Sequence, residues 1–143
     1  MDTNSNRTKM SSQPNRFTCL VIEDEVLAIE MLVDYINRRG DLELLGIGTE
    51  LSEVRDLLEK HRPAIIFLDL VIPLGESAGY HFGRIPVTSS IIVVSGIPLS
   101  HYKGDLPKGD IYELPKPVSF ASFDQCVNEV INKGKGYLYG VEI

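Results

Sequence analysis

Five polar side chains of this 143-residue chain stand just beyond apolar runs, at positions where they could do chemistry together. They are Glu23, Asp24, Asp69, Ser95 and Lys116. Carboxylates brought into one pocket repel one another, so such a group persists only where a cation or a lysine offsets the charge. A hard divalent ion held through a few carboxylates and waters suits Mg²⁺, and a hydroxyl and an ammonium beside it can hold phosphoryl oxygens. These residue types therefore indicate Mg²⁺-assisted phosphoryl chemistry, if the fold brings them together.

The elements that would position these side chains follow from the hydrophobic pattern. Strands are predicted for short, largely apolar runs at 17–22, 42–48, 64–68, 90–94 and 110–114. Helices are predicted over 27–39 and 119–133, because apolar residues recur there at helical spacing, and another follows the second strand with its apolar stripe between Val54 and His61.

Capping residues mark the expected helix ends. Gly40 is the predicted C-terminal stop of the first helix. Ser52 is the predicted N-cap of the second. Ser119 and Ser122 are equally good N-caps for the last helix, Ser122 because it stands at capping-box spacing from a glutamine.

Two connections carry poor helix signals. Glycine and proline interrupt both 75–86 and 97–109, so the helix expected over 77–84 is weak and short, and any helix in the second stretch is short or broken. Strand and helix otherwise alternate, which favours an α/β fold with an open, doubly wound, parallel sheet. Pro115 has no N–H, which places the last strand at a sheet edge. Ligands of such sheets bind beyond the carboxyl ends of the strands, where the polar side chains fall.

Composition and charge exclude several kinds of partner. The formal net charge of −6 argues against direct binding of nucleic acid, whose phosphates require a basic surface. No apolar run reaches the ~20 residues needed to cross a membrane, and residues 1–16 form a polar tail, expected to be disordered, without a secretory signal. Cys19 and Cys126 lack CxxC spacing and are predicted to be buried free thiols. We expect a cytoplasmic protein with one domain over 17–133 and a C-terminal extension over 134–143.

Four short motifs occur in one order along the chain. They are Val21-Ile22-Glu23-Asp24-Glu25, Leu68-Asp69-Leu70-Val71-Ile72-Pro73, Ser95-Gly96 and Lys116-Pro117. Together they resemble the receiver domains of response regulators in two-component systems, over roughly residues 17–132. The resemblance implies a flavodoxin-like receiver fold with strand order 2-1-3-4-5, here with shortened third and fourth helices. It also implies a phosphoacceptor signalling domain, and no enzyme beyond its own phosphorylation and dephosphorylation.

The resemblance assigns the acceptor and the metal ligands position by position. Asp69 resembles the phosphoacceptor, a carboxylate nucleophile that forms an acyl phosphate. Glu23 and Asp24 resemble the acidic pair that positions Mg²⁺, with Asp24 as the direct ligand of the two. Asp69 itself and the backbone carbonyl of Val71 complete the ligands that this resemblance implies.

Further positions surround the phosphoryl site. Ser95 matches the switch hydroxyl that is recruited to the phosphoryl group, and Gly96 matches the small residue that leaves room for it. Lys116 matches the lysine that pairs with the phosphoaspartate, and its bond to Pro117 resembles the family's cis peptide. The third position before this lysine, often aromatic in receivers, is Glu113. We expect Glu113 to face solvent, because burial of an unpaired carboxylate is unfavourable.

The resemblance implies a histidine kinase or a phosphotransfer protein as phosphodonor, and a change of conformation on phosphorylation. It leaves open the output partner, a homodimer, and whether the chain stands alone or belongs to a longer regulator. One alternative is a degenerate receiver that acts as a phosphorylation-independent interaction module, against which the complete set of site residues argues. The other is a phosphatase of the haloacid dehalogenase type, whose Asp-x-Asp motif would need an aspartate where Val71 stands.

Overall fold

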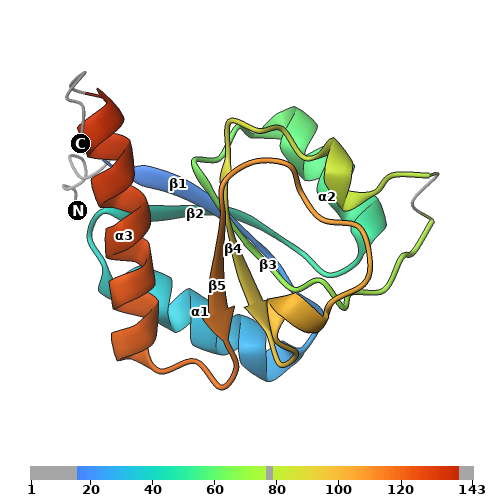
Figure 1. The fold of residues 1–143 in the computed structure, drawn as a ribbon, viewed down its shortest axis with the longest axis horizontal. Helices are drawn as coiled ribbons and strands as arrows, with labels where there is room; N and C mark the ends of the chain where they lie inside the picture. Colours follow the sequence, from blue (N-terminus) through green and yellow to red (C-terminus); the bar gives the residue numbers. More distant parts are fainter. Residues whose placement is uncertain (1–15, 77–78, 139–143) are drawn as a thin grey trace, which may run out of the picture.

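The chain folds into an open parallel sheet with helices on both faces (Figure 1). The computed structural model describes residues 16–76 and 79–138, with side chains described as far as Lys133. The strands are β1 (Phe17–Ile22), β2 (Leu42–Gly48), β3 (Ile65–Leu68), β4 (Ser90–Ser95) and β5 (Ile111–Pro115). The helices are α1 (Val26–Arg38), α2 (Leu51–Lys60) and α3 (Phe120–Leu138), with 3₁₀ turns η3 (Phe82–Arg84) and η4 (Leu99–His101).

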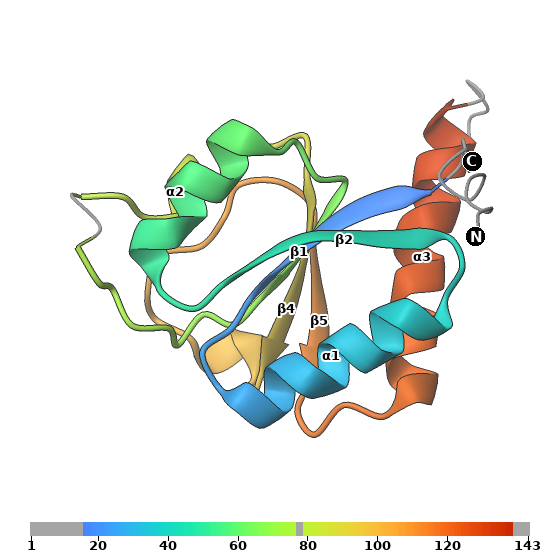
Figure 2. The same ribbon diagram turned by 180° about the vertical axis from the view of Figure 1, so that it is seen from behind.

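The sheet has the order β2-β1-β3-β4-β5, with every pairing parallel. This confirms the α/β fold class and the strand order. Helices α1 and α3 pack on one face and α2 and η3 on the other, as two opposite views show (Figure 2). β5 lies at a sheet edge, in agreement with the prediction from Pro115. Among the described residues, no helix is both long enough and apolar enough to cross a membrane.

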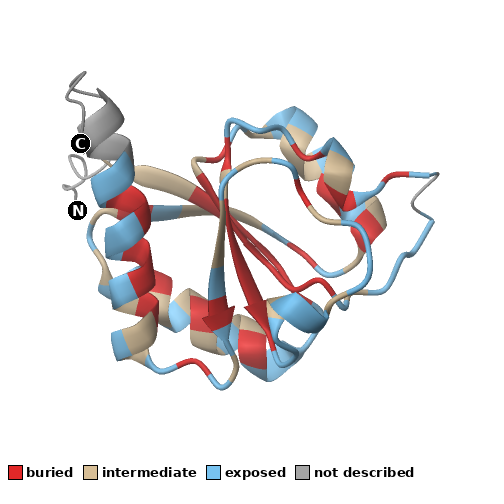
Figure 3. Cartoon of the chain, viewed as in Figure 1, coloured by how far each residue is buried: buried red, intermediate tan, exposed pale blue. Residues whose placement is uncertain are grey.

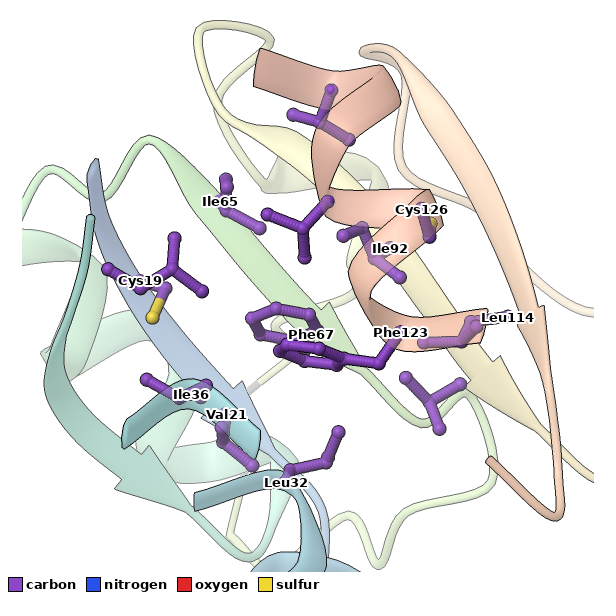
Figure 4. Packing of buried hydrophobic residues seen from close by; sticks show 14 of the residues in the cluster. Cys19, Val21, Leu32, Ile36, Ile65, Phe67, Ile92, Leu114, Phe123 and Cys126 are labelled. Carbon is purple, nitrogen blue, oxygen red and sulfur yellow. The ribbon is translucent and has the colours of Figure 1, made fainter. Parts of the chain in front are cut away.

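The core lies on both faces of the central strands, which are buried along most of their length (Figure 3). All residues of β3 are buried, as its continuous apolar run predicts for a strand covered on both sides. On the α1–α3 face, Phe67 of β3 stacks on Phe123 of α3 with ring centroids 5.4 Å apart (Figure 4). Truncation of a buried phenylalanine typically destabilises a protein by about 3–5 kcal/mol, so this pair is a principal link between α3 and the sheet.

The predicted end of the first helix is wrong by one residue. α1 ends at Arg38, and Arg39 adopts an extended conformation while its N–H donates to the carbonyl of Ile36 at 3.1 Å. Gly40 therefore lies beyond the cap, and its left-handed conformation is not used. The Arg39 side chain also binds Asp124 of α3 at 2.7 Å, so a tertiary contact favours this end over a glycine cap.

The predicted cap of the second helix is also wrong. α2 begins at Leu51, so Ser52 lies inside its first turn, and the N-cap residue makes no side-chain hydrogen bond. Instead, the N–H groups of Leu51 and Ser52 donate to the carbonyls of Pro73 and Leu74, at 2.8 and 3.1 Å. Free N–H groups at a helix start need acceptors, and here the loop after β3 supplies them.

Ser119 caps the last helix, since its Oγ accepts the N–H of Ser122 at 3.1 Å. α3 continues to Leu138, beyond its predicted end at Lys133. Residues 1–15 of the predicted N-terminal tail lie outside the described residues. So do residues 139–143 of the predicted C-terminal extension.

The third and fourth helices are shortened, as the sequence predicts. Only the three-residue turns η3 and η4 occupy the described parts of the two connections. Residues 77–78 of the predicted weak helix lie outside the described residues. The connection between β3 and β4 still contributes Tyr80, Phe82 and Ile85 to the core on the α2 face, so loops replace helices as part of the cover of this face.

The thiols of Cys19 and Cys126 are free and buried, which confirms the sequence-based expectation. Burial, with a smaller contribution from Glu43, raises the pKa of Cys19 to about 12. Burial, with a smaller contribution from Glu129, raises the pKa of Cys126 to about 11. Because the thiolate is the reactive form, both thiols should be inert in the folded protein.

We expect neither cysteine to react with a thiol-specific disulfide reagent at pH 8 in the native protein. Both should react at once in denaturant, because unfolding removes the burial that suppresses the thiolate. Spectrophotometric titration of free thiols checks this. A thiol that reacts rapidly in the native state would contradict its position in the core.

Candidate phosphoacceptor site

The side chains for which the sequence predicts chemistry all lie at the carboxyl edge of the sheet, and four of them, Glu23, Asp24, Asp69 and Lys116, form one cluster. Main-chain hydrogen bonds continue the ladder one residue past the strands and fix these positions. The Asp69 N–H donates to the carbonyl of Ile22 at 2.9 Å, and the Lys116 N–H donates to the carbonyl of Ser95 at 2.9 Å. The polar residues are thus placed by strand register, before any side-chain contact is made.

The acidic residues form one cluster, as the sequence predicts. Glu23, Asp24 and Asp69 each offer a carboxylate oxygen, and these three atoms lie within 4.8 Å of one another. Glu23 is 1% exposed and Asp69 7% exposed, whereas Asp24 is exposed to solvent. The cluster thus combines two buried carboxylates with one accessible carboxylate at the rim, and carboxylate oxygens are the ligands that a small hard cation prefers.

Lys116 lies against this cluster and offsets part of its charge. Its Nζ is 3.1 Å from Glu23 Oε1 and 3.3 Å from Asp69 Oδ2. It also lies 3.8 Å from Glu25 Oε1, a carboxylate for which the sequence predicted no role in the site. No sequence pattern around Glu25 could predict this contact, because Glu25 and Lys116 are far apart in the sequence.

The pKa values of Glu23 and Lys116 are both shifted by this environment. Burial raises the pKa of Glu23, the nearby carboxylate of Asp69 raises it further, and the N–H of Glu25 and the ammonium of Lys116 oppose the shift. Burial alone would lower the pKa of Lys116, but contact with Glu23 and the charge of Asp69 outweigh it and raise the pKa. Lys116 therefore stays protonated at neutral pH and balances one of two buried carboxylates.

The donor set fits Mg²⁺. The ligand atoms are carboxylate oxygens, which hard divalent ions prefer, and a single ammonium cannot neutralise three carboxylates at this edge. Glu23 Oε1 faces Lys116 Nζ at 3.1 Å and its Oε2 accepts the N–H groups of Asp24 and Glu25 at 3.1 Å, so the more accessible oxygens for an ion are those of Asp24 at the rim. The Val71 carbonyl remains a predicted ligand. The N–H of Val71 donates to Asp69 Oδ1 at 2.9 Å and so orients the Asp69 carboxylate.

Ser95 is buried at the end of β4, beside the acidic cluster in the strand order. Its Oγ accepts the N–H of Ile97 at 3.0 Å. At the next residue, Gly96, an added Cβ would meet no atom within 4 Å, so the space beside the strand end is open. The bond between Lys116 and Pro117 is cis, as the resemblance implied.

Glu113 has the predicted orientation toward solvent. Glu113 pairs with Val93 in the β4–β5 register and its side chain is exposed. Tyr112 packs against the core on the α1–α3 face, next to the neighbouring strand residue Ile92. The register thus leaves Glu113, and not Tyr112, on the side of η4. The sequence did not reveal that Glu113 has a backbone partner there, the N–H of Leu99 at 2.7 Å.

The comparisons with known proteins agree with this geometry, although no family model matches the chain. A stretch of 56 residues is 34% identical to an uncharacterized response regulatory protein of Shewanella oneidensis, covering 39% of this chain and 24% of that protein. Another of 59 residues is 36% identical to transcriptional regulatory protein CitB of Klebsiella pneumoniae, covering 41% of this chain and 25% of that protein. The matches span about a quarter of the length of these relatives.

Solved structures share the fold. The response regulatory domain of protein mrkE from Klebsiella pneumoniae superimposes with a TM-score of 0.61 at 18% identity, over 81% of this chain and 96% of that chain. The REC domain of the PhyR response regulator from Erythrobacter litoralis gives 0.62 at 17% identity, over 82% and 91%.

The fold and the strand-end site define the class: a doubly wound, flavodoxin-like domain with an acidic cluster at the carboxyl edge of its sheet. Within that class, the chain is similar in sequence to response regulators over stretches of 56 and 59 residues and shares its fold with response regulator receiver domains.

Mg²⁺ should raise the melting temperature of the wild-type protein, because an ion that binds only the folded state stabilises it by mass action. At about ten times Kd the gain in the free energy of unfolding is about 1.4 kcal/mol. Asp24→Ala and Asp69→Asn should lose this gain, and Asp69→Asn should also be more stable than wild type without Mg²⁺, since repulsion of Glu23 is relieved.

Thermal melts with and without Mg²⁺ measure both effects. Asp34→Asn is the matched control, because Asp34 is an exposed carboxylate paired with Arg38 on α1, away from the cluster. An equal Mg²⁺ shift in all four proteins would assign the ion to the general surface charge and not to this site.

Proposed function

We propose that the chain accepts a phosphoryl group on Asp69 from a histidine kinase or a phosphotransfer protein, in a Mg²⁺-dependent reaction that switches its conformation. The observation that carries this proposal is the constellation at the sheet edge: Asp69 Oδ2 lies 3.3 Å from Lys116 Nζ, within the cluster of three carboxylates. A degenerate receiver has no need of these groups in one place.

The chemistry follows from the contacts of Asp69. One carboxylate oxygen accepts the Val71 N–H, which orients the group, while the other faces Lys116. A carboxylate oxygen attacks the phosphorus of a phosphohistidine, the P–N bond breaks, and the imidazole leaves and takes up a proton, so the product is an acyl phosphate. A bound Mg²⁺ would offset the charge of the transferred oxygens, and the Lys116 ammonium would hold another of them.

The surface around Asp69 supports transfer from a protein donor. Direct transfer requires a donor histidine to reach the acceptor, so the donor must cover the rim of this site. On that rim, Leu27 in the first turn of α1 is 73% exposed, and its neighbour Val26 is also exposed. Leu27 borders a pocket of about 390 Å³ between α1 and the loop that begins at Lys116. We propose that the phosphodonor packs on this apolar surface at the start of α1.

A cytoplasmic location of the chain would accord with such a donor.

One prediction of this proposal concerns the acceptor. Incubation with acetyl phosphate and Mg²⁺ should add one phosphoryl group to the wild-type protein, and none to Asp69→Asn, which keeps the size of the side chain and removes the nucleophile. Intact-protein mass spectrometry measures the addition, and circular dichroism verifies the fold. Undiminished labelling of Asp69→Asn would place the acceptor elsewhere, and absence of labelling in wild type would favour the phosphorylation-independent module.

A second prediction separates the donor surface from the chemistry. Leu27→Asp should slow phosphotransfer from a histidine kinase or phosphotransfer protein at least about tenfold, because a buried hot-spot contact is typically worth 1.4 kcal/mol or more. Its labelling by acetyl phosphate should stay unchanged.

The matched control is Val87→Asp, since Val87 is 65% exposed but precedes the amino end of β4, on the opposite edge of the sheet. The rates are measured with a donor protein that phosphorylates the wild-type chain. Equal slowing by both substitutions would count against a donor surface at α1.

A further inference from the structure

The segment between β4 and η4 is fastened by two hydrogen bonds from its backbone to side chains. The N–H of Ile97 donates to Ser95 Oγ at 3.0 Å, and the N–H of Leu99 donates to Glu113 Oε2 at 2.7 Å. Pro98, between them, has no N–H to donate. One anchor is the residue at the phosphoryl site, and the other is a carboxylate on the neighbouring strand.

Glu113 is suited to hold this segment. It stands on β5 opposite Val93, and its side chain lies on the sheet face that η4 covers, whereas Tyr112 and Leu114 pack on the opposite face. A carboxylate that accepts an N–H at this distance makes a charge-assisted hydrogen bond, stronger than one between neutral groups. Its exposure means that the bond can open without burial of an unpaired charge.

The two anchored residues, Ile97 and Leu99, are separated only by Pro98. Pro98 has φ −55°, a value that its ring holds nearly fixed. A displacement of Ile97 is therefore passed to Leu99 through a stiff residue. A Ser95 hydroxyl that turns toward a phosphoryl group on Asp69 alters its bond to the Ile97 N–H, and this strains the bond between Leu99 and Glu113.

We propose that Glu113 is a latch: its hydrogen bond to Leu99 holds residues 96–99 in the unphosphorylated conformation and opposes recruitment of Ser95. The proposal rests on the proposed function and concerns the regulation of the same site. A contact made in only one of two states shifts their equilibrium by its own free energy. Loss of the latch therefore favours the switched state, and switching frees the Leu99 N–H.

The far end of the same loop is held separately. Asp105 Oδ2 accepts the N–H of Gly83 at 2.7 Å and lies 3.0 Å from His81 Nδ1, so this carboxylate ties the loop to η3. Asp105, like Glu113, is an exposed carboxylate that accepts a backbone N–H, but Ser95 is not among its partners in the described structure. Its removal loosens the loop without touching the latch, which makes it a matched control.

Beryllofluoride with Mg²⁺ serves as the phosphoryl mimic, and isothermal titration calorimetry measures its affinity for the full chain. Glu113→Ala should bind it about threefold to tenfold more tightly than wild type, the factor expected for loss of one such hydrogen bond in the unbound state. Glu113→Gln should fall between wild type and Glu113→Ala, because its amide oxygen still accepts the Leu99 N–H but without the charge that strengthens the bond. Asp105→Ala should bind as wild type does.

Hydrogen exchange of the Leu99 amide gives an independent readout. In wild type, exchange should accelerate when beryllofluoride binds, and in Glu113→Ala it should already be fast without it. Unchanged affinity of Glu113→Ala, or an equal rise in Asp105→Ala, would overturn the latch while leaving the proposed function intact. Absence of beryllofluoride binding to wild type would overturn the proposed function, and the latch with it.

Discussion

The ammonium of Lys116 between two buried carboxylates is the interaction on which the site depends. Glu23 and Asp69 lie 3.1 and 3.3 Å from it, and without a cation two such anions could not both stay ionised away from water. The raised pKa of Lys116 keeps the balancing charge in place at neutral pH. With Asp24 included, the cluster has three carboxylates for the one ammonium of Lys116. A divalent ion would offset the remaining negative charge. The Asp69 carboxylate therefore lies between a lysine on one side and an acidic rim on the other.

Strand register, more than any single side-chain contact, makes this arrangement possible. Asp69 follows a strand that pairs with β1, so it emerges beside Glu23, and Lys116 emerges beside Ser95 for the same reason. Parallel strands all present their carboxyl ends at one edge, and chemistry-bearing residues scattered along the sequence thereby become neighbours. A slip of one residue in β5 would turn its side chains to the opposite face; the observed register places Glu113 toward η4.

The sequence was most informative where a residue's environment is set by its own segment. Strands buried on both faces read as continuous apolar runs, so the sheet and the residues at its carboxyl edge were predicted correctly. The Ser119 cap of α3 is local and was predicted, but the start of α2 was not, because its N–H groups bind the carbonyls of Pro73 and Leu74 from a remote loop. Likewise the exposure of Glu113 could be predicted from its charge, whereas its bond to Leu99 joins two elements and has no local signature.

The connections after β3 and β4 are held in place in the same way. Each lacks a full helix, and each is held instead by hydrogen bonds between backbone groups and distant partners, as at Leu74 for the first and at Glu113 and Asp105 for the second. A helix distributes its stability over many internal hydrogen bonds, so no single side chain controls it. A loop fastened at a few points can be released at one of them while the others hold. The loss of helix in this chain therefore concentrates control of the segment next to Ser95 in the few side chains that anchor it.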